Sequence, residues 1–347
     1  MFVVVGEALV DLVGQRGSRT LVAHPGGSPA NVALGLARLD NQVTLVTRLG
    51  RDALGEMVSA HLRSNGVRVD GGPGQGTSTS LAIATLAAGI ATYDFRIEWD
   101  VGALAPLPIE ARCLHTGSLA TALAPGATNV EDLMGRERKR GRATISYDPN
   151  VRPGLLGSPA QARPAIERIV GLCDVVKVSD EDLYWLYPDR RDEEVAREWL
   201  GRGPAVVVVT RGGQGVYATT ADLELSRPAL PIDLVDTVGA GDSFTSGLLD
   251  GLRRADLIGG PRRTALASID ESTLISVLDA AALVAAITCS RPGADPPTRA
   301  EVDATHAART STTRTAPLGT SRGISPPMGD PELAASPGVA PEQGSQR

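Results

Sequence analysis

The sequence predicts an α/β fold in which helices flank a doubly wound, mostly parallel sheet. Short runs rich in β-branched residues alternate along the chain with stretches whose apolar residues recur at helical spacing. Apolar residues make up 42% of the chain but aromatic residues only 3%, so Ala, Val, Leu and Ile must build the core. This mixture suits helices packed on buried parallel strands, and the alternation implies right-handed βαβ units.

The expected elements follow one another in a regular order. Strands are expected at residues 2–5, 43–47, 143–147, 175–178 and 205–210. Helices are expected at residues 29–39, 53–64, 129–140, 159–170 and 193–200. Because open sheets of this kind bind ligands at the carboxyl ends of their strands, a site is expected in the loops that follow these strands.

Two apolar runs, residues 80–86 and 90–97, depart from this order. A short Ala-Ala-Gly turn joins them, which is the pattern of an antiparallel hairpin. Together with residues 8–13 and 20–23, the hairpin is expected to form a small separate sheet. The sequence therefore predicts lid strands around residues 8–23 and 80–98.

The length of 347 residues accommodates one large domain, which is expected to span residues 1–304. From about Thr305 onward, Ser, Thr, Pro, Gly and Ala dominate and the apolar periodicity ends, which is typical of disorder. Residues 305–347 are therefore predicted to be a disordered C-terminal tail. The turn-rich residues 259–270 are expected to be a loop between two helices.

Composition and charge argue against several classes of protein. The net charge of -6 disfavours a nucleic-acid-binding protein with a broad phosphate footprint. Cys113, Cys173 and Cys289 lack the paired spacing of a zinc site, which favours reduced thiols in the core. No apolar run reaches the roughly 18 residues of a membrane helix, and no signal peptide pattern precedes the first strand. A cytoplasmic protein without nucleic-acid or membrane partners is expected.

The most informative stretch is Asp-Thr-Val-Gly-Ala-Gly-Asp-Ser-Phe, residues 236–244, between an expected strand at 232–235 and an expected helix at 243–253. Its glycines leave consecutive N–H groups at a helix N-terminus, which is a ready anion site. Asp242 lies in the same turn. A carboxylate beside a bound anion is electrostatically unfavourable, which suggests that Asp242 takes part in a reaction. Asp242 would take part in the reaction if it accepted the proton of an alcohol that attacks phosphorus. Asp242 as a simple N-cap fits these residues equally well.

A second glycine-rich stretch, Gly-Gly-Ser-Pro-Ala-Asn-Val-Ala, occupies residues 26–33. Pro29 is favourable in the first turn of a helix, and Gly26 and Gly27 let a ligand approach the backbone closely. Asn31 offers both a hydrogen-bond donor and an acceptor to a polyol. These residues alone fit an ordinary helix-initiating loop as well.

The two stretches resemble, in the expected order, the two signatures of the ribokinase family, the PfkB carbohydrate kinases. Residues 236–244 match the family pattern Asp-Thr-x-Gly-Ala-Gly-Asp, followed by a small residue and Phe, in full. The resemblance covers about residues 1–300. It implies a ribokinase-like fold and a kinase that uses ATP and Mg²⁺ to phosphorylate a sugar.

The resemblance also implies roles for single residues. Asp242 would be the catalytic base. The anion hole would comprise Gly239, Ala240 and Gly241, of which the glycines also contact the nucleotide. The sugar contacts would be Asp11, Gly26, Gly27, Asn31 and Asp242. Asp236 would lie at the family's monovalent-cation site, with K⁺ as the expected ion.

Residues 177–182, Lys-Val-Ser-Asp-Glu-Asp, resemble the family's Asn-x-x-Glu element, which organises magnesium and phosphate. Ser179 stands in place of Asn, as in fructokinase-like members, and Asp182 stands in place of Glu. Because Asp is one methylene shorter, Asp182 is expected to contact Mg²⁺ through water. An N-cap with acidic residues in the first turn explains the same residues, and both interpretations remain open.

Residues 209–215, Val-Thr-Arg-Gly-Gly-Gln-Gly, resemble the family's nucleotide loop. The expected nucleotide contacts outside the anion hole are Lys177, Ser179, Thr210, Gly212 and Gly215. Residues 281–282 and 293–294 resemble the helix and loop on the adenine side. Arg96, on the lid hairpin, is expected to bind a sugar hydroxyl or a substrate phosphate, although an exposed Arg needs no ligand. The lid is also expected to support a homodimer.

Fructose is the preferred substrate on resemblance. Residues 6–11, the Ser-Pro-Ala-Asn form of the first signature and Asp-Pro-Asn-Val-Arg-Pro at 148–153 look more like a fructokinase or a 2-keto-3-deoxygluconate kinase than like other PfkB sugar or nucleoside kinases. A non-catalytic sugar-binding or regulatory protein on this fold is the alternative of another class.

Two other enzyme classes are disfavoured. In a dinucleotide-dependent oxidoreductase a Gly-x-Gly-x-x-Gly run follows the first strand, whereas the glycine-rich residues 72–76 do not open an apolar helix. The Gly-x-x-x-x-Gly-Lys-Ser/Thr pattern of a P-loop kinase does not occur in the sequence.

Overall fold

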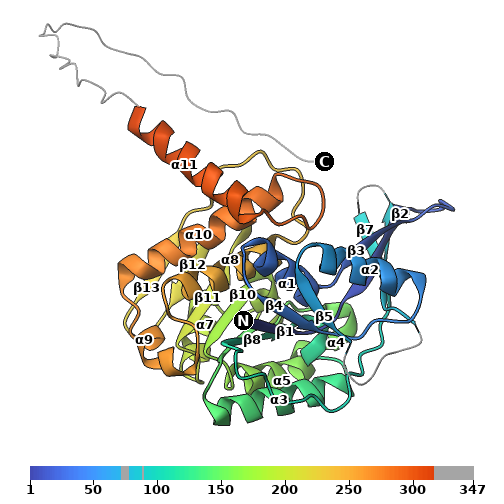
Figure 1. Cartoon of the computed structure of the whole chain (residues 1–347), viewed down its shortest axis with the longest axis horizontal. Helices are drawn as coiled ribbons and strands as arrows, with labels where there is room; N and C mark the ends of the chain where they lie inside the picture. The colour runs from blue at the N-terminus through green and yellow to red at the C-terminus, as the bar shows by residue number, and fades with distance from the viewer. Residues whose placement is uncertain (72–77, 88–89, 316–347) are drawn as a thin grey trace, which may run out of the picture. The chain divides into compact units, whose positions relative to one another are not determined.

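The structure is a computed structural model that describes residues 1–71, 78–87 and 90–315 (Figure 1). Contacts divide the chain into two units, residues 1–307 and 308–347, and the first unit holds both sheets. The glycine-rich run at 72–76, the tip of the lid hairpin and residues 316–347 of the expected tail lie outside the described residues.

A nine-stranded sheet forms the centre of the first unit. In spatial order its strands are Glu224–Arg227 (β13), Val216–Thr219 (β12), Val206–Thr210 (β11), Val175–Ser179 (β10), Thr144–Asp148 (β9), Cys113–Gly117 (β8), Phe2–Val5 (β1), Val43–Val46 (β4) and Val67–Asp70 (β5). Every pair from β11 to β5 is parallel, whereas β12 pairs antiparallel with both β11 and β13. The expected doubly wound, mostly parallel sheet is confirmed.

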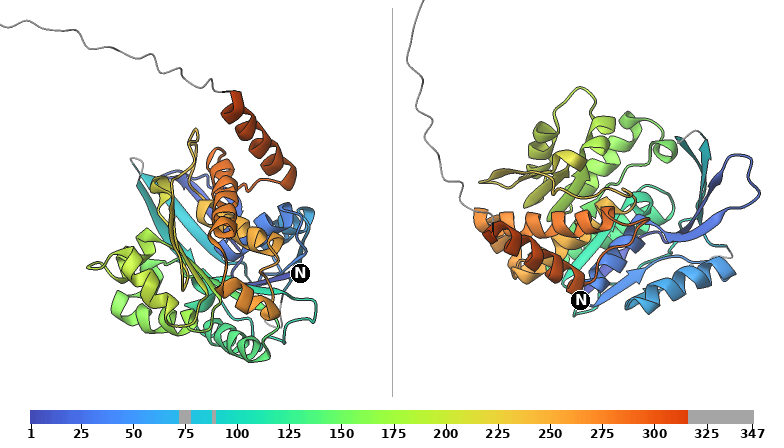
Figure 2. Two further views of the ribbon diagram at one scale, coloured as in Figure 1. Left: turned by 90° about the vertical axis from the view of Figure 1, so that its left-hand side faces the viewer. Right: turned by 90° about the horizontal axis from the view of Figure 1, so that it is seen from above.

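Helices cover both faces of this sheet (Figures 1 and 2). One face carries Ser28–Arg38 (α1), Ala53–Ser64 (α2), Ala240–Arg254 (α8), Arg263–Ala267 (α9) and Glu271–Cys289 (α10). The other carries Gly126–Arg140 (α3), Pro159–Val170 (α5), Asp180–Leu186 (α6) and Asp192–Leu200 (α7). Alternate residues of β11 show why the strand is apolar throughout: Val206 and Val208 join one core and Val207 and Val209 the other.

The expected lid strands form a separate four-stranded sheet. Its order is Val22–Gly26 (β3), Leu9–Gln15 (β2), Leu81–Ala87 (β6) and Ile90–Arg96 (β7). β2 pairs antiparallel with β3 and parallel with β6, and β6 and β7 form the expected hairpin. Since β2 begins four residues after β1 ends, the small sheet adjoins the carboxyl edge of the large one.

Three expectations about secondary structure are wrong. Residues 232–235 form a loop, in which Leu234 is 64% exposed, because no neighbouring strand pairs with them. Residues 259–270 contain a 3-10 turn, Gly260–Arg262, and the short helix α9. The helix Arg299–Thr315 (α11) includes residues 305–315 of the expected tail, so helical structure continues beyond the point where the apolar periodicity ends.

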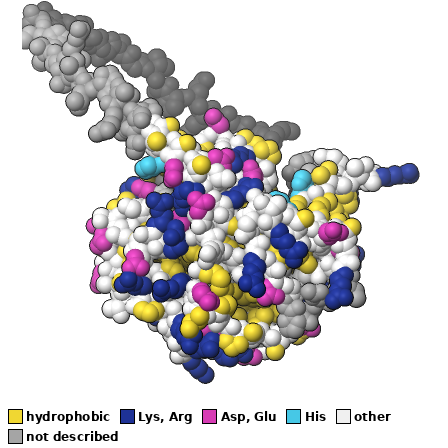
Figure 3. All heavy atoms as spheres, viewed as in Figure 1, with side chains coloured by type: hydrophobic (Ala, Val, Ile, Leu, Met, Phe, Trp, Pro, Cys, Tyr) yellow, Lys and Arg dark blue, Asp and Glu magenta, His cyan; other side chains and the backbone are white. Residues whose placement is uncertain are grey.

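One described helix, α10, is long and apolar enough to cross a membrane by length and composition alone. Its residues Leu274, Val277, Leu278 and Ala281 are buried in the core that also contains residues of α8. Burial within the protein thus accounts for its apolar character. On the face seen in Figure 3, basic and acidic side chains are interspersed.

Candidate active site

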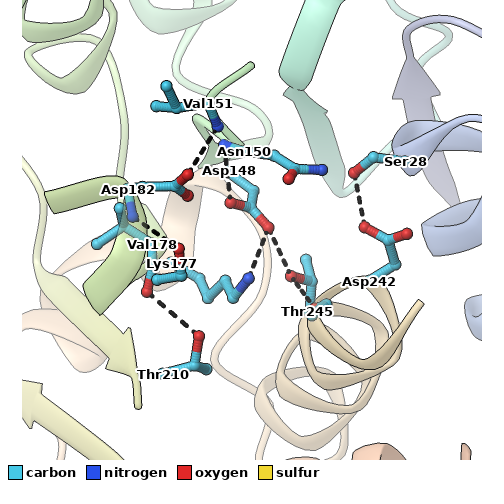
Figure 4. Close-up of polar contacts among 12 residues, drawn as sticks. Ser28, Asp148, Asn150, Val151, Lys177, Val178, Asp182, Thr210, Asp242 and Thr245 are labelled. Carbon is cyan, nitrogen blue, oxygen red and sulfur yellow. Dashed lines mark hydrogen bonds and ion pairs between the residues drawn. The ribbon is translucent and has the colours of Figure 1, made fainter. Parts of the chain in front are cut away.

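The candidate site lies at the carboxyl edge of the large sheet, where three parallel strands end. Asp148 ends β9, Ser179 ends β10 and Thr210 ends β11. The start of α8 faces this edge, and Thr245 of α8 donates a hydrogen bond to Oδ2 of Asp148 at 3.3 Å (Figure 4). A cavity of about 590 Å³ opens here, a volume typical of small-molecule sites.

The turn before α8 is built by glycine. Gly239 has φ +74°, a left-handed conformation that glycine adopts without strain. The helix that follows carries the positive end of its dipole there, and of its first N–H groups that of Ala240 donates to the carbonyl oxygen of Thr237 at 3.1 Å. Gly239, Ala240 and Gly241 all line the cavity, so this turn can receive an anion.

Asp242 is nearly enclosed, with 8% of its surface exposed, and it lines the same cavity. Oδ1 accepts a hydrogen bond from the Ser28 hydroxyl at 2.6 Å, and Oδ2 accepts one from the Asn31 amide at 2.9 Å. Burial raises the pKa of Asp242, while the bonds from Ser28 and Asn31 act in the opposite direction. The two signature stretches therefore meet at this carboxyl group.

A buried ion pair lies beside the anion turn. Nζ of Lys177 is 3.0 Å from Oδ2 of Asp148, and both side chains are almost fully buried. The same Nζ lies 2.9 Å from the position that a Cβ atom on Gly241 would occupy. Burial alone would lower the pKa of Lys177, but Asp148 reverses this effect and the pKa is raised. A permanent positive charge is thus held against the turn.

Ser179 and Asp182 at the start of α6 carry out the capping role. The hydroxyl of Ser179 accepts a hydrogen bond from the backbone N–H of Asp182 at 3.0 Å, which confirms the N-cap. Oδ1 of Asp182 accepts one from the N–H of Val151 at 2.9 Å. Burial, and next the negative charge of Asp148, raise the pKa of Asp182 to about 6. Asp182 also lines the cavity, so its contact with a metal stays a prediction.

The expected nucleotide contacts line the cavity. They are Lys177, Ser179, Thr210, Gly212, Gly215, Gly239 and Gly241. The adjoining wall is apolar and comes from the loop before α8 and from α10: Ile232, Leu234, Ala282, Ala285, Ala286 and Cys289. A polar, cationic end of the cavity at Lys177 thus continues into an apolar end against α10.

The expected sugar contacts lie on the other side of Asp242, between α1 and the small sheet. Gly27 has φ +104°, and a Cβ atom there would come within 2.5 Å of the carbonyl oxygen of Glu7. The carboxylate of Asp11 on β2 occupies the space that a side chain at Gly26 would fill. Burial raises the pKa of Asp11, the charges of His24 and Arg152 oppose this effect, and the negative charge of Asp242 adds to it.

Arg96 is the expected site residue that the structure places elsewhere. In the small sheet Arg96 pairs with Leu81, which pairs with Val10, whereas Asp11 pairs with Ala82. Because directly paired residues share a face and neighbours alternate, Arg96 points away from the face of Asp11. Its side chain is 71% exposed and forms an ion pair with Asp94 at 3.2 Å. The expectation of a substrate contact is therefore wrong for this conformation.

Asp236 ties two loops together. Oδ1 accepts a hydrogen bond from the N–H of Val238 at 3.1 Å, and Oδ2 accepts one from the N–H of Gly293 at 2.7 Å. The carboxylate thus joins the turn before α8 to the loop after α10. Each oxygen keeps a free lone pair, so a cation contact at Asp236 stays a prediction.

Three residues of the site were not among those expected from the sequence: Asp148, Ser28 and Thr245. An acidic residue at the end of an apolar strand was the available signal for Asp148. Ser28 contacts a residue 214 positions away in the sequence, so local patterns hold no sign of that contact.

Comparisons with known proteins agree with this arrangement. The profile of the pfkB family carbohydrate kinases matches residues 1–301. A fructokinase of Rhizobium leguminosarum bv. trifolii is 31% identical over 283 residues, 79% of this chain and 85% of that protein. A fructokinase of Klebsiella pneumoniae is 34% identical over 260 residues, 72% of this chain and 83% of that protein.

Solved structures show the same fold. A fructokinase from Xylella fastidiosa with bound ATP superposes with a TM-score of 0.76 at 25% identity, covering 89% of this chain and 99% of that one. A double mutant of the Vibrio cholerae O395 fructokinase, in its fructose, ADP and potassium ion bound form, gives 0.72 at 26% identity, with 87% and 97% covered. The chain belongs to the pfkB family of carbohydrate kinases.

Proposed function

We propose that this protein is an ATP-dependent fructokinase, in which Asp242 is the catalytic base. The observation that carries the proposal is the meeting of both signatures at one buried carboxylate: Ser28 and Asn31 bind Asp242 directly. The similarity to several fructokinases supports fructose as the acceptor.

The chemistry follows from the positions of these groups. Asp242 takes the proton of the sugar hydroxyl as its oxygen attacks the γ-phosphorus of ATP, and ADP departs. Negative charge on the transferred group would be stabilised by the N–H groups of Gly241 and Asp242 in the first turn of α8 and by Lys177, which lies against Gly241. On the sugar side, Asp11 and the backbone at Gly27 would bind the other hydroxyls. The low exposure of Asp242 keeps bulk water away from the base.

Magnesium fits the nucleotide end of the site in part. Asp182 and Asp148 repel each other electrostatically, and a divalent cation would relieve that repulsion. Within the described ranges, no group of three or more metal-binding side chains occurs, so phosphate oxygens and water would complete the coordination. Asp182 would hold the ion, which would neutralise phosphate charge.

A monovalent cation is proposed beside Asp236, which would contribute a carboxylate oxygen. A potassium ion is present in the related Vibrio cholerae fructokinase structure. Turnover in potassium salts is expected to exceed turnover in tetramethylammonium salts, and equal rates in the two would reject this site.

We also place the protein in the cytoplasm as a homodimer formed through the lid. Cys113 and Cys173 are free, buried thiols, in keeping with a reducing compartment. Leu21 and Val22 next to the β3 edge are 42% and 55% exposed, and an exposed strand edge with apolar side chains favours pairing with a second copy. Sedimentation at micromolar concentration is expected to give a dimer, and a monomer would contradict it.

One observation favours a second substrate. Arg152 lines the cavity, and the hydrogen bonds of its Nη1 within the described chain go to neutral oxygens of Asn150 and Val151. The charge of Arg152 also acts on the nearby carboxyl groups of Asp11 and Asp182, and a guanidinium that lines the cavity can bind the carboxylate of an acidic sugar. 2-Keto-3-deoxygluconate is therefore the second candidate acceptor.

The test is a substrate screen. Release of ADP is measured with ATP and Mg²⁺ for fructose, glucose, ribose, adenosine and 2-keto-3-deoxygluconate. The highest kcat/KM is expected for fructose. A higher value for the sugar acid would shift the assignment to the second candidate, and no sugar-dependent release with any acceptor would reject the kinase.

A further inference from the structure

The hydroxyl of Ser28 is held directly on the carboxylate that would act as base. Ser28 is the first residue of α1, is 9% exposed, and donates to Oδ1 of Asp242 at 2.6 Å. An ionised carboxylate offers about four lone-pair positions, and the bonds from Ser28 and Asn31 take two of them. The remaining positions are open to the hydroxyl of an incoming sugar.

The backbone around Ser28 fixes where its hydroxyl points. Gly27 takes a left-handed conformation, and Pro29 sets the first turn of α1. Pro29 also packs so closely on Gly6 that a side chain at Gly6 would collide with it. The Ser28 hydroxyl is therefore presented by a rigid turn and not by a flexible loop.

The charges around Asp242 affect its pKa, and the Ser28 hydroxyl acts on the same equilibrium. Asp11 on β2 and Asp148 at the end of β9 disfavour the ionised form, whereas Lys177 on β10 favours it. Burial raises the pKa of Asp242 more than any of these charges. A donated hydrogen bond stabilises the ionised carboxylate more than the protonated carboxyl group, so the bond from Ser28 lowers the pKa of Asp242 and opposes the effect of burial.

We propose that Ser28 is a positioning residue that keeps Asp242 ionised at neutral pH and aims it at the acceptor hydroxyl. The inference rests on the proposed role of Asp242 as base. In this proposal the first signature, residues 26–33, orients the catalytic carboxylate in addition to binding the sugar. Ser28 itself does not need to touch the substrate.

The experiment compares the pH dependence of phosphoryl transfer in single turnovers, with the best sugar of the screen, in the wild type and in Ser28→Ala. Loss of the hydrogen bond should move the midpoint of the acid limb up by about one pH unit, so that the rate well below the midpoint falls about tenfold. At high pH, where Asp242 is ionised in both proteins, the two rates should converge to within a few-fold.

Ser246→Ala is the matched control. Ser246, on α8, is also a buried serine, but its hydroxyl donates to the carbonyl oxygen of Ser243 at 2.8 Å. Its removal should leave the acid limb in place. Ser28→Thr, which keeps a hydroxyl, should restore the wild-type midpoint.

An unchanged midpoint in Ser28→Ala, or an equal shift in Ser246→Ala, would overturn the inference. If Ser28→Ala does not melt cooperatively, Ser28→Cys replaces it, because a thiol is a weak donor and a shift in the same direction is expected. These outcomes are distinct from failure of the proposed function, which would appear as absent sugar-dependent turnover in the wild type.

Discussion

Asp242 and Asp148 are both buried at the same cavity, but their negative charges are balanced in different ways. Asp242 accepts hydrogen bonds from two neutral side chains, Ser28 and Asn31, and its pKa is raised. Asp148 faces the ammonium group of Lys177 at 3.0 Å. A carboxylate paired with a full positive charge is a poor proton acceptor, whereas one held by neutral donors can take up a proton. The comparison supports the proposal that Asp242 is the base, whereas Asp148 forms the ion pair with Lys177.

The largest expected effect on turnover comes from replacing Asp242. Asp242→Asn keeps the shape of the side chain and its place beside Ser28 and Asn31 but cannot accept the sugar proton. We expect kcat to fall by about 10³-fold with the fold intact, as measured by ADP release and thermal melting. A kcat within tenfold of the wild type would show that another group is the base.

The ion pair should respond in both stability and rate. Asp148→Asn leaves the Lys177 charge buried and unpaired, so the free energy of unfolding should fall by about 3–5 kcal/mol. The double variant Asp148→Asn, Lys177→Met removes both charges and should recover most of that loss. It should nevertheless remain about 100-fold slower than the wild type, because the charge beside Gly241 is gone.

Urea unfolding and kcat of the single and double variants measure the two effects together. Equal stability of the single and double variants would mean that the two charges do not depend on each other. A double variant with wild-type kcat would remove Lys177 from the proposed chemistry.

A third buried carboxyl group, Glu7, gives the smallest effect. Glu7 is 3% exposed, its Oε2 accepts a hydrogen bond from the N–H of Ala120 at 3.1 Å, and burial raises its pKa to about 7 from the usual 4.5. A raised pKa in the folded state means that its contribution to stability is full below about pH 4.5 and is lost as pH rises through about 7.

Glu7→Gln lacks this titration. As pH rises from about 4.5 to about 8, the wild type should therefore lose about 1–3 kcal/mol of unfolding free energy relative to Glu7→Gln. Urea unfolding of both proteins at the two pH values tests this. A difference that stays constant with pH would show that Glu7 does not titrate as described.

The sequence predicts the parts of the fold that depend on local pattern. Buried strands such as β11 are continuous apolar runs, and helices such as α2 have clear periodicity, so their positions were predicted to within a few residues. Residues 232–235 contain three branched apolar residues and Asp233 but form a loop, because strand formation depends on a partner strand that the sequence does not reveal.

The residues of the site likewise fall into those that a local motif predicts and those that only the tertiary structure reveals. Asp242 and the glycines before it lie within one short motif, so the sequence identifies them directly. The roles of Ser28 and Asp148 arise only when α1, β9 and β10 come together with α8, and Arg96 was assigned to the site because the strand register was unknown. Contacts between distant segments, and the face to which a strand residue points, need the tertiary structure.

The most direct test of the central claim is the binding of both substrates to Asp242→Asn, measured by calorimetry with fructose and with a non-hydrolysable ATP analogue. A group that works on the proton only during transfer contributes little to ground-state binding. We predict that both Kd values stay within about threefold of the wild type while turnover is lost. Loss of binding of either ligand in the folded variant would contradict the account, because it would assign Asp242 to holding substrates and not to activating the sugar hydroxyl.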